Sequence, residues 1–183
     1  MSKKVYILLA DGFELIEALT PVDVLRRGGV DVATVSINDD YDVASAQKVT
    51  VKSDVLLSLH DLSDGDMLVL PGGFPGYENL ANSKRVVELV KEYDSKGKYI
   101  AAICGAPTVL SKNGIMKGKV LTCHHSVAED MKDYKYTGKV VETDGNLITA
   151  IGAGKALDFA LKMAEVLVDK NTMDKIKKGM EIK

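Results

Sequence analysis

Short apolar runs alternate along the chain with segments in which apolar residues recur every three or four positions. The apolar runs predict strands, and the periodic segments predict helices. The predicted strands cover residues 5–9, 31–37, 67–70, 99–103 and 120–122, with short ones near 49–51 and 55–57, and a hairpin pairs 140–143 with 147–150. The predicted helices cover residues 14–27, 83–96, 106–112 and 156–168, followed by a basic helix or tail over 171–178.

This alternation predicts an α/β fold, in which a mostly parallel sheet carries helices on both faces. The run 67–70 lacks polar residues, as expected of a parallel strand that is buried on both faces. A length of 183 residues fits a single domain over 1–183. Sites in such sheets form beyond the carboxyl ends of the strands, so the residues that follow each apolar run are the candidates for function.

Charge and composition exclude several classes of protein. The chain has 24 Lys and Arg against 26 Asp and Glu, a net charge of −2 that offers no general attraction to nucleic acid or anionic lipid. The first apolar run has only six residues, whereas a secretory signal needs about 7–15 and a membrane span about 20. Two cysteines are too few for a disulfide framework. We therefore expect a cytoplasmic protein with reduced thiols that binds neither nucleic acid nor membrane.

Cys104 is the strongest candidate for chemistry. It follows the predicted strand 99–103 and precedes Gly105, Ala106 and a predicted helix. A strand, a sharp turn and a helix form a nucleophile elbow, which exposes the side chain at the turn. The start of the helix favours the thiolate, because its positive end lies near the sulfur. The alternative is a small thiol buried in the core.

Glycines and one carboxyl supply the groups that such a thiol needs. Gly72 and Gly73 follow the strand 67–70, and their N–H groups together with that of Gly105 form a predicted oxyanion site, although a tight turn also explains the pair. Glu17 lies among apolar residues of the first helix and is expected to face inward. A buried carboxyl has a raised pKa, so it donates a hydrogen bond when protonated and acts as a base when ionised. An exposed helix carboxylate is the alternative.

The segment Cys123-His124-His125 ends another predicted strand. Adjacent residues of a strand point to opposite faces, which disfavours a shared metal ion, and ordinary loop histidines are the preferred interpretation. His124 and Cys123 remain accessory candidates for the site. The glycines at 152 and 154 do not continue into a dinucleotide fingerprint, because Leu157 stands where that motif requires Gly. We expect neither a metal nor a cofactor.

Four segments, in this order and at these spacings, carry a family resemblance. They are Asp11-Gly12-Phe13-Glu14 through Glu17, residues 21–28, Leu70-Pro71-Gly72-Gly73, and residues 101–107 around Cys104. The chain resembles the DJ-one superfamily, also called ThiJ/PfpI, nearly from end to end. The resemblance implies a flavodoxin-like three-layer sandwich of the class I glutamine amidotransferase type, usually a homodimer. It also implies that Glu17 hydrogen-bonds the sulfur of Cys104 and that the N–H groups of Gly73 and Gly105 face it.

The resemblance also implies a function and leaves alternatives open. Relatives are glutathione-independent glyoxalases or deglycases, so we expect Cys104 and Glu17 to act on a small aldehyde. The alternative is a redox sensor or chaperone in oxidative stress, whose partner is an oxidant that converts Cys104 to a sulfinate. A cysteine peptidase or amidase with His124 as base is a third hypothesis. It is weakened because protease-like members carry His directly after the nucleophile, where this chain has Gly105.

Overall fold

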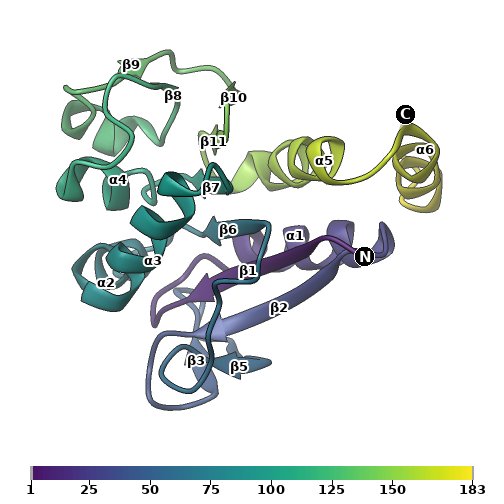
Figure 1. The fold of residues 1–183 in the computed structure, drawn as a ribbon, viewed down its shortest axis with the longest axis horizontal. Coiled ribbons are helices and arrows are strands. Elements are labelled where there is room, and N and C mark those ends of the chain that lie inside the picture. The colour runs from purple at the N-terminus through teal and green to yellow at the C-terminus, as the bar shows by residue number, and fades with distance from the viewer. Residues whose placement is uncertain (1, 183) are drawn as a thin grey trace.

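A seven-stranded sheet runs through the middle of the protein, for which a computed structural model describes residues 2–182 (Figure 1). The strand order is β10-β11-β7-β6-β1-β2-β5. These strands are β1 (Lys4–Leu9), β2 (Asp31–Ser36), β5 (Val55–Leu56), β6 (Met67–Leu70), β7 (Tyr99–Ile103), β10 (Val141–Asp144) and β11 (Leu147–Ala150). Every neighbouring pair is parallel except the hairpin of β10 and β11, so the predicted mostly parallel sheet is confirmed.

Helices cover both faces of the sheet, which confirms the predicted three layers. One face packs against α2 (Gly76–Asn82), α3 (Lys84–Ser95) and α4 (Thr108–Asn113). The other face packs against α1 (Leu15–Arg27), α5 (Ala156–Leu167) and α6 (Lys170–Gly179). Successive strand residues alternate between the two cores, so Tyr6 and Leu8 face α2–α4, whereas Ile7 and Leu9 face α1 and α5. None of the helices within residues 2–182 has the length and apolar character needed to cross a bilayer.

Local capping residues mark the ends of two predicted helices. Gly28 caps α1, and the hydroxyl of Ser83 accepts a hydrogen bond from the Val86 N–H at the start of α3. The predicted tail after α5 is the helix α6, which Asp169 caps. Helix α2 was not predicted, because its seven residues are too few to show an apolar period.

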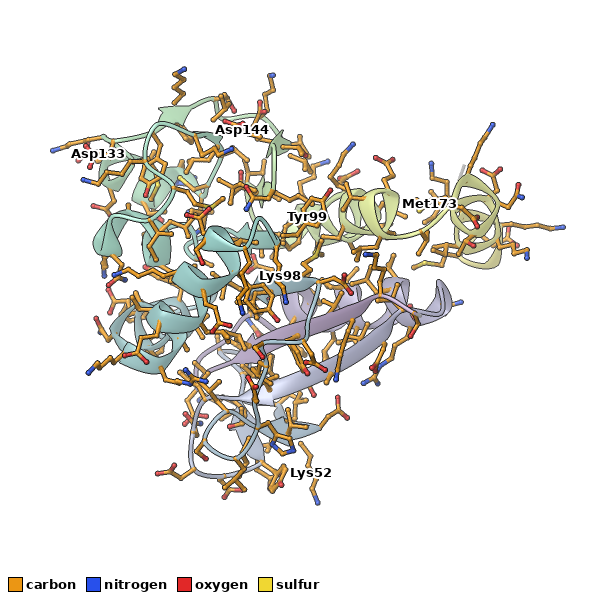
Figure 2. The ribbon with its side chains drawn as sticks, in the orientation of Figure 1. Lys52, Lys98, Tyr99, Asp133, Asp144 and Met173 are labelled. Atoms are coloured by element: carbon orange, nitrogen blue, oxygen red, sulfur yellow. The ribbon has the colours of Figure 1, made fainter. Side chains whose placement is uncertain are left out.

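One predicted strand lies outside the seven-stranded sheet. The strand expected at 120–122 forms as β8 (Val120–Leu121), but it pairs in parallel with β9 (Lys135–Tyr136) in a separate two-stranded sheet. The carboxylate of Asp144, labelled in Figure 2, accepts a hydrogen bond from the Val120 N–H at 2.8 Å and so ties β8 to the hairpin. A second small sheet joins β3 (Asp42–Ala44) to β4 (Thr50–Lys52), and short 3-10 helices cover His125–Asp130 and Ala153–Lys155. The segment 120–122 therefore contains a strand, as predicted, but this strand does not belong to the main parallel sheet.

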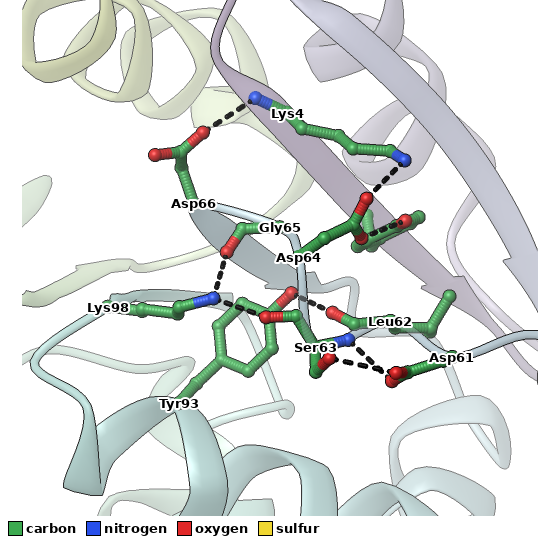
Figure 3. A network of polar contacts seen from close by, with 10 residues as sticks. Lys4, Asp61, Leu62, Ser63, Asp64, Gly65, Asp66, Tyr93 and Lys98 are labelled. Atoms are coloured by element: carbon green, nitrogen blue, oxygen red, sulfur yellow. Dashed lines mark hydrogen bonds and ion pairs between the residues drawn. The ribbon is translucent and has the colours of Figure 1, made fainter.

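A polar network fixes the loop that enters β6, at the end of the sheet where the central strands begin (Figure 3). The hydroxyl of Tyr93 donates to the carbonyl of Leu62, and the ammonium of Lys98 donates to the carbonyls of Ser63 and Gly65. The ammonium of Lys98 also lies 5.0 Å from the centre of the Tyr93 ring. These contacts satisfy the carbonyls of an irregular loop, so this end of the sheet is held by polar bonds that involve none of the candidate residues.

Candidate active site

Three neighbouring strands carry the predicted site residues. Strands β7, β6 and β1 lie side by side in parallel, so their carboxyl ends meet at one edge of the sheet. Helix α1 after β1 carries Glu17, the turn after β6 carries Gly72 and Gly73, and the turn after β7 carries Cys104 and Gly105. The parallel pairing thus places a carboxyl, a thiol and three glycines together. In the sequence, 88 positions separate the first of these residues, Glu17, from the last, Gly105.

Cys104 stands on a strained turn, as expected for a nucleophile elbow. Its φ is +63°, a left-handed conformation that costs a residue other than Gly about 1–3 kcal/mol. Two backbone hydrogen bonds of 2.9 Å hold it, from the Cys104 N–H to the carbonyl of Ala150 and from the His124 N–H to the carbonyl of Cys104. The side chain is half-buried. Strand β11 and the segment after β8 therefore impose the conformation that aims the thiol out of the sheet.

Glu17 faces inward, as predicted, and is completely buried. Its Oε2 accepts a hydrogen bond of 2.8 Å from the Gly72 N–H, whereas Oε1 is buried without a hydrogen-bond partner among residues 2–182. A methyl group on Gly72 would lie 2.6 Å from Oε2 of Glu17 and 2.7 Å from Cβ of Cys104, so only glycine fits between the acid and the thiol. A buried polar atom without a partner is costly, and this one belongs to the carboxyl that interacts with the Cys104 side chain.

Gly72 does not belong to the oxyanion site that the sequence predicts. The N–H of Gly72 is already bonded to Glu17, so Gly72 positions the carboxyl and does not face an oxyanion. The N–H groups of Gly105 and Gly73 are directed at the sulfur of Cys104, where they favour its charged form. Gly73 has a φ of +89°, and a Cβ there would lie 2.2 Å from the N of Glu14. The position of Gly73 requires glycine on both counts.

Burial dominates the protonation of the two acids. It raises the pKa of Glu17 to about 7, against the lowering effect of the Gly72 hydrogen bond. Burial and, after it, the nearby carboxylate of Glu17 raise the pKa of Cys104 to about 12, against the lowering effect of the N–H groups of Gly105 and Gly73. The expectation of a thiolate stabilised by the helix end was wrong in this respect. Helix α4 has six residues and begins only at Thr108, so burial outweighs its dipole.

The adjacent acids share their protons. The first proton leaves the pair near neutral pH, and the second leaves only at much higher pH. Moving the thiol proton onto the Glu17 carboxylate creates a thiolate beside a neutral carboxyl without changing the net charge of the site. Glu17 can thus serve as base for Cys104 and then as hydrogen-bond donor to its thiolate.

The raised pKa of Glu17 predicts how stability changes with pH. Between its ordinary value of 4.5 and about 7, the folded protein binds more protons than the unfolded chain. The free energy of unfolding therefore falls as pH rises through this window, by up to about 3 kcal/mol. Glu17→Gln removes this titration, so urea unfolding over the window should show a stability that falls less than that of wild type. Glu129→Gln, which changes an exposed carboxyl, is the control and should follow wild type. Parallel curves for wild type and Glu17→Gln would contradict the prediction.

Cys123 and His124 differ in their relation to the sulfur. Cys123 is completely buried in the core that faces α2–α4, and burial raises its pKa to about 11. The Nδ1 of His124 accepts from the Ser126 N–H at 3.3 Å, which assigns the ring proton of the neutral form to Nε2. A Cβ on Gly152 would lie 3.5 Å from Cδ2 of His124 and 4.0 Å from Sγ of Cys104, so Gly152 lies next to both side chains. No hydrogen bond between them is present in residues 2–182.

A surface pocket of about 600 Å³ opens on this side of the site. Its walls include His124, His125, Tyr136, Gly152 and Lys155. The centroids of the His124 and His125 rings lie 4.2 Å apart. Burial lowers the pKa of His124, and the charge of His125 lowers it further. Within residues 2–182, His, Cys, Asp and Glu form no group of three that could hold a metal ion.

Two aromatic residues border the site and were missed by sequence reasoning. Phe74 directly follows Gly73, and the ring of Tyr77 lies over Gly105, where a methyl group would come within 2.5 Å of two ring carbons. Both belong to the turn and first residues of α2, the helix that was not predicted. The available signal was an aromatic residue placed directly after the Pro-Gly-Gly turn of a buried strand.

Comparison with known proteins decides the family. Residues 3–166 match the DJ-1/PfpI family. The chain belongs to that family. It is 40% identical over 182 residues to protein dj-1beta of Drosophila melanogaster, which covers 98% of this chain and 97% of the relative. It is 37% identical over 156 residues to a Caenorhabditis elegans protein named glutathione-independent glyoxalase DJR-1.2, which covers 84% and 82% of the two chains.

The fold comparison agrees with this assignment. The crystal structure of Drosophila melanogaster DJ-1beta matches with a TM-score of 0.97 and 39% identity, and the match covers 100% of both chains. This DJ-1 family protein therefore has the DJ-1 fold, and the predicted class I glutamine amidotransferase-like architecture is confirmed.

Proposed function

We propose that this DJ-1 family protein converts small 2-oxoaldehydes, or their adducts, to 2-hydroxy acids without glutathione. The carrying observation is the buried, unpartnered Oε1 of Glu17 beside a half-buried thiol on a strained turn. Such an acid can take a proton from the thiol and return it elsewhere, which is the chemistry that this conversion requires. The Caenorhabditis elegans relative is named a glutathione-independent glyoxalase, which supports the substrate class.

The proposed reaction begins with the thiol. Its proton passes to the carboxylate of Glu17, and the sulfur of Cys104 attacks the aldehyde carbon, so that a C–S bond forms and the carbonyl oxygen becomes an oxyanion. The N–H groups of Gly73 and Gly105 are directed at this region and stabilise the oxyanion. Protonation of the oxyanion by Glu17 gives a hemithioacetal and restores the carboxylate.

An internal hydrogen shift completes the conversion. Glu17 removes the proton from the former aldehyde carbon and delivers a proton to the neighbouring carbon, which turns the hemithioacetal into the thioester of a 2-hydroxy acid. Water then attacks the thioester, the C–S bond breaks, and the thiol regains its proton. For methylglyoxal the sum is one aldehyde and one water giving one lactic acid. The two carbons exchange oxidation levels, so no external oxidant or reductant enters.

The test is lactate formation from methylglyoxal in the absence of glutathione. We expect lactate to accumulate at a rate proportional to protein concentration and above that of a protein-free blank. The second candidate is a redox sensor or chaperone, favoured by the same amides around the sulfur, which also stabilise a sulfinate. A protein that gains two oxygens at Cys104 in mild peroxide but releases no lactate would overturn the first proposal in favour of the second.

The peptidase hypothesis requires a Cys–His hydrogen bond, and none joins His124 to Cys104 within residues 2–182, so we do not propose it. Assembly as a homodimer is consistent with the exposed apolar side chains of Ile16 on α1 and Leu157 on α5, which border one groove.

A further inference from the structure

Phe74 is an apolar side chain that the fold holds in the open. Its ring is 66% exposed, although it directly follows Gly73 of the site. The loop that carries it is fixed, because the Glu14 N–H donates to the carbonyl of Gly72 and the Tyr77 N–H donates to the carbonyl of Gly73, both at 2.9 Å. These two hydrogen bonds hold the backbone next to Phe74 in the position that exposes its side chain.

Close packing on the other side of the loop strengthens this restraint. A methyl group on Gly12 would lie 2.4 Å from Cδ of Pro75, and one on Gly76 would lie 2.6 Å from the N of Phe13. The side chain of Asn79 donates to the carbonyl of Asp11 at 2.9 Å. The start of α2 is thus packed against the turn after β1, and this packing restrains the backbone that follows Phe74.

Phe74 and Tyr77 form an aromatic pair. Their ring centroids lie 6.2 Å apart with an angle of 58° between the planes, an ordinary tilted arrangement. Tyr77 is packed over Gly105 and half-buried, whereas Phe74 extends the same apolar surface outward. We call these two rings the aromatic wall.

The aromatic wall stands beside the reacting atoms. The N–H groups of Gly73 and Gly105 face the sulfur of Cys104, and each ring is attached to or packed on one of these glycines. Gly152 borders the sulfur as well. A substrate carbon bonded to the sulfur therefore lies next to the two glycines that carry or contact these rings.

The charges around the wall favour a neutral substituent. Burial raises the pKa of the Tyr77 hydroxyl, and the groups of Glu78, Cys104 and Asp130 raise it further when they are ionised. The thiol of Cys104 is protonated at neutral pH, so the negative groups near this ring are the carboxylates of Glu78 and Asp130. Lys112 lies 3.7 Å from the carboxylate of Glu78, with both side chains exposed to water, which screens that pair. An uncharged apolar or aromatic group fits such a surface better than an anionic one.

We propose that the aromatic wall of Phe74 and Tyr77 sets the substrate preference of the Cys104 site, favouring 2-oxoaldehydes with an aryl or large apolar substituent over methylglyoxal. This proposal rests on the proposed function for its turnover measurement. With phenylglyoxal the balance is the same as above: one aldehyde and one water give one mandelic acid, through a C–S bond that forms and then breaks. In this proposal the two rings contact the substituent of the substrate and take no part in proton transfer.

The first arm of the test compares kcat/KM for phenylglyoxal and methylglyoxal. In Phe74→Ala the ratio of kcat/KM for phenylglyoxal to that for methylglyoxal should fall by about three- to tenfold, the value of one aromatic contact. Tyr77→Phe keeps both rings and should retain the wild-type ratio. Leu59→Ala is the matched control, since Leu59 is 70% exposed and follows β5, an outermost strand of the sheet that carries none of the site residues. An unchanged ratio in Phe74→Ala would overturn the proposal.

The second arm does not depend on turnover. The rates at which 2-bromoacetophenone and bromoacetone alkylate Cys104 are compared by mass spectrometry in wild type and Phe74→Ala. We expect the aryl reagent to lose its advantage in the variant. If wild type releases neither acid but the alkylation ratio still falls in Phe74→Ala, the proposed function fails and the aromatic wall stands. If the alkylation ratio is the same in both proteins, the wall is refuted whatever the turnover shows.

Discussion

Cys104→Ala should abolish lactate formation from methylglyoxal, with a loss of about a thousandfold or more in kcat/KM. The reason is that the proposed reaction proceeds through a C–S bond, and alanine offers no atom that can form it. The backbone at this position is fixed by Ala150 and His124, so the amides that face the site stay in place in the variant. Lactate release measured against the protein-free blank gives the loss directly.

The second cysteine supplies the control. Cys123 also follows a strand, but its side chain is completely buried in the core that faces α2–α4. Cys123→Ala should lower the free energy of unfolding by about 1 kcal/mol, as expected for a small cavity, and leave turnover close to wild type. Equal loss in both variants would indicate a folding effect, and retained activity in Cys104→Ala would exclude covalent catalysis by this thiol.

Glu17→Gln should lower turnover by about 10²–10⁴-fold. Glutamine has the shape of glutamate, and its carbonyl oxygen can accept the hydrogen bond that Gly72 now donates to Oε2. It cannot take up a proton, however, so both the activation of the thiol and the hydrogen shift between carbons lose their base. The value of kcat should fall more than KM rises, because the lost interaction acts in the transition state.

Alkylation of Cys104 separates this effect from a collapsed site. Iodoacetamide should still label Cys104 in the folded Glu17→Gln protein, since the elbow does not depend on Glu17. Glu17→Ala is a poorer test, because it leaves the buried N–H of Gly72 without a partner at a cost of about 1–3 kcal/mol. A Glu17→Gln protein with wild-type kcat would show that the proton travels through another group.

The central part of the fold and of the site was predictable because it depends on local patterns. Unbroken apolar runs mark the strands β1, β6 and β7, and parallel pairing then brings the residues after them to one edge. The elbow at Cys104 followed from small residues between a strand and a helix. These inferences needed only the sequence near each residue and one general rule about parallel sheets.

The remaining features depend on contacts between distant segments. Strand β8 pairs with β9 because Asp144 and the hairpin hold it there, which no pattern within 120–122 reveals. The hydrogen bond of Gly72 to Glu17 and the burial that raises the pKa of Cys104 arise only after packing. The resemblance to a known family supplied the pairing of Glu17 with Cys104, whereas Phe74 and Tyr77 lay outside both kinds of reasoning.

The absence of a side chain at Gly72 has a consequence for the precision of the site. A single backbone segment separates the acid from the thiol, with no room for even a methyl group. The spacing between Glu17 and Cys104 is thus set by how β6 and β7 pair and by how α1 packs, and no flexible side chain intervenes to adjust it. Under the proposed mechanism, the distance for proton transfer between Glu17 and Cys104 therefore depends on the central strands, and changing it would require a change in how they pack.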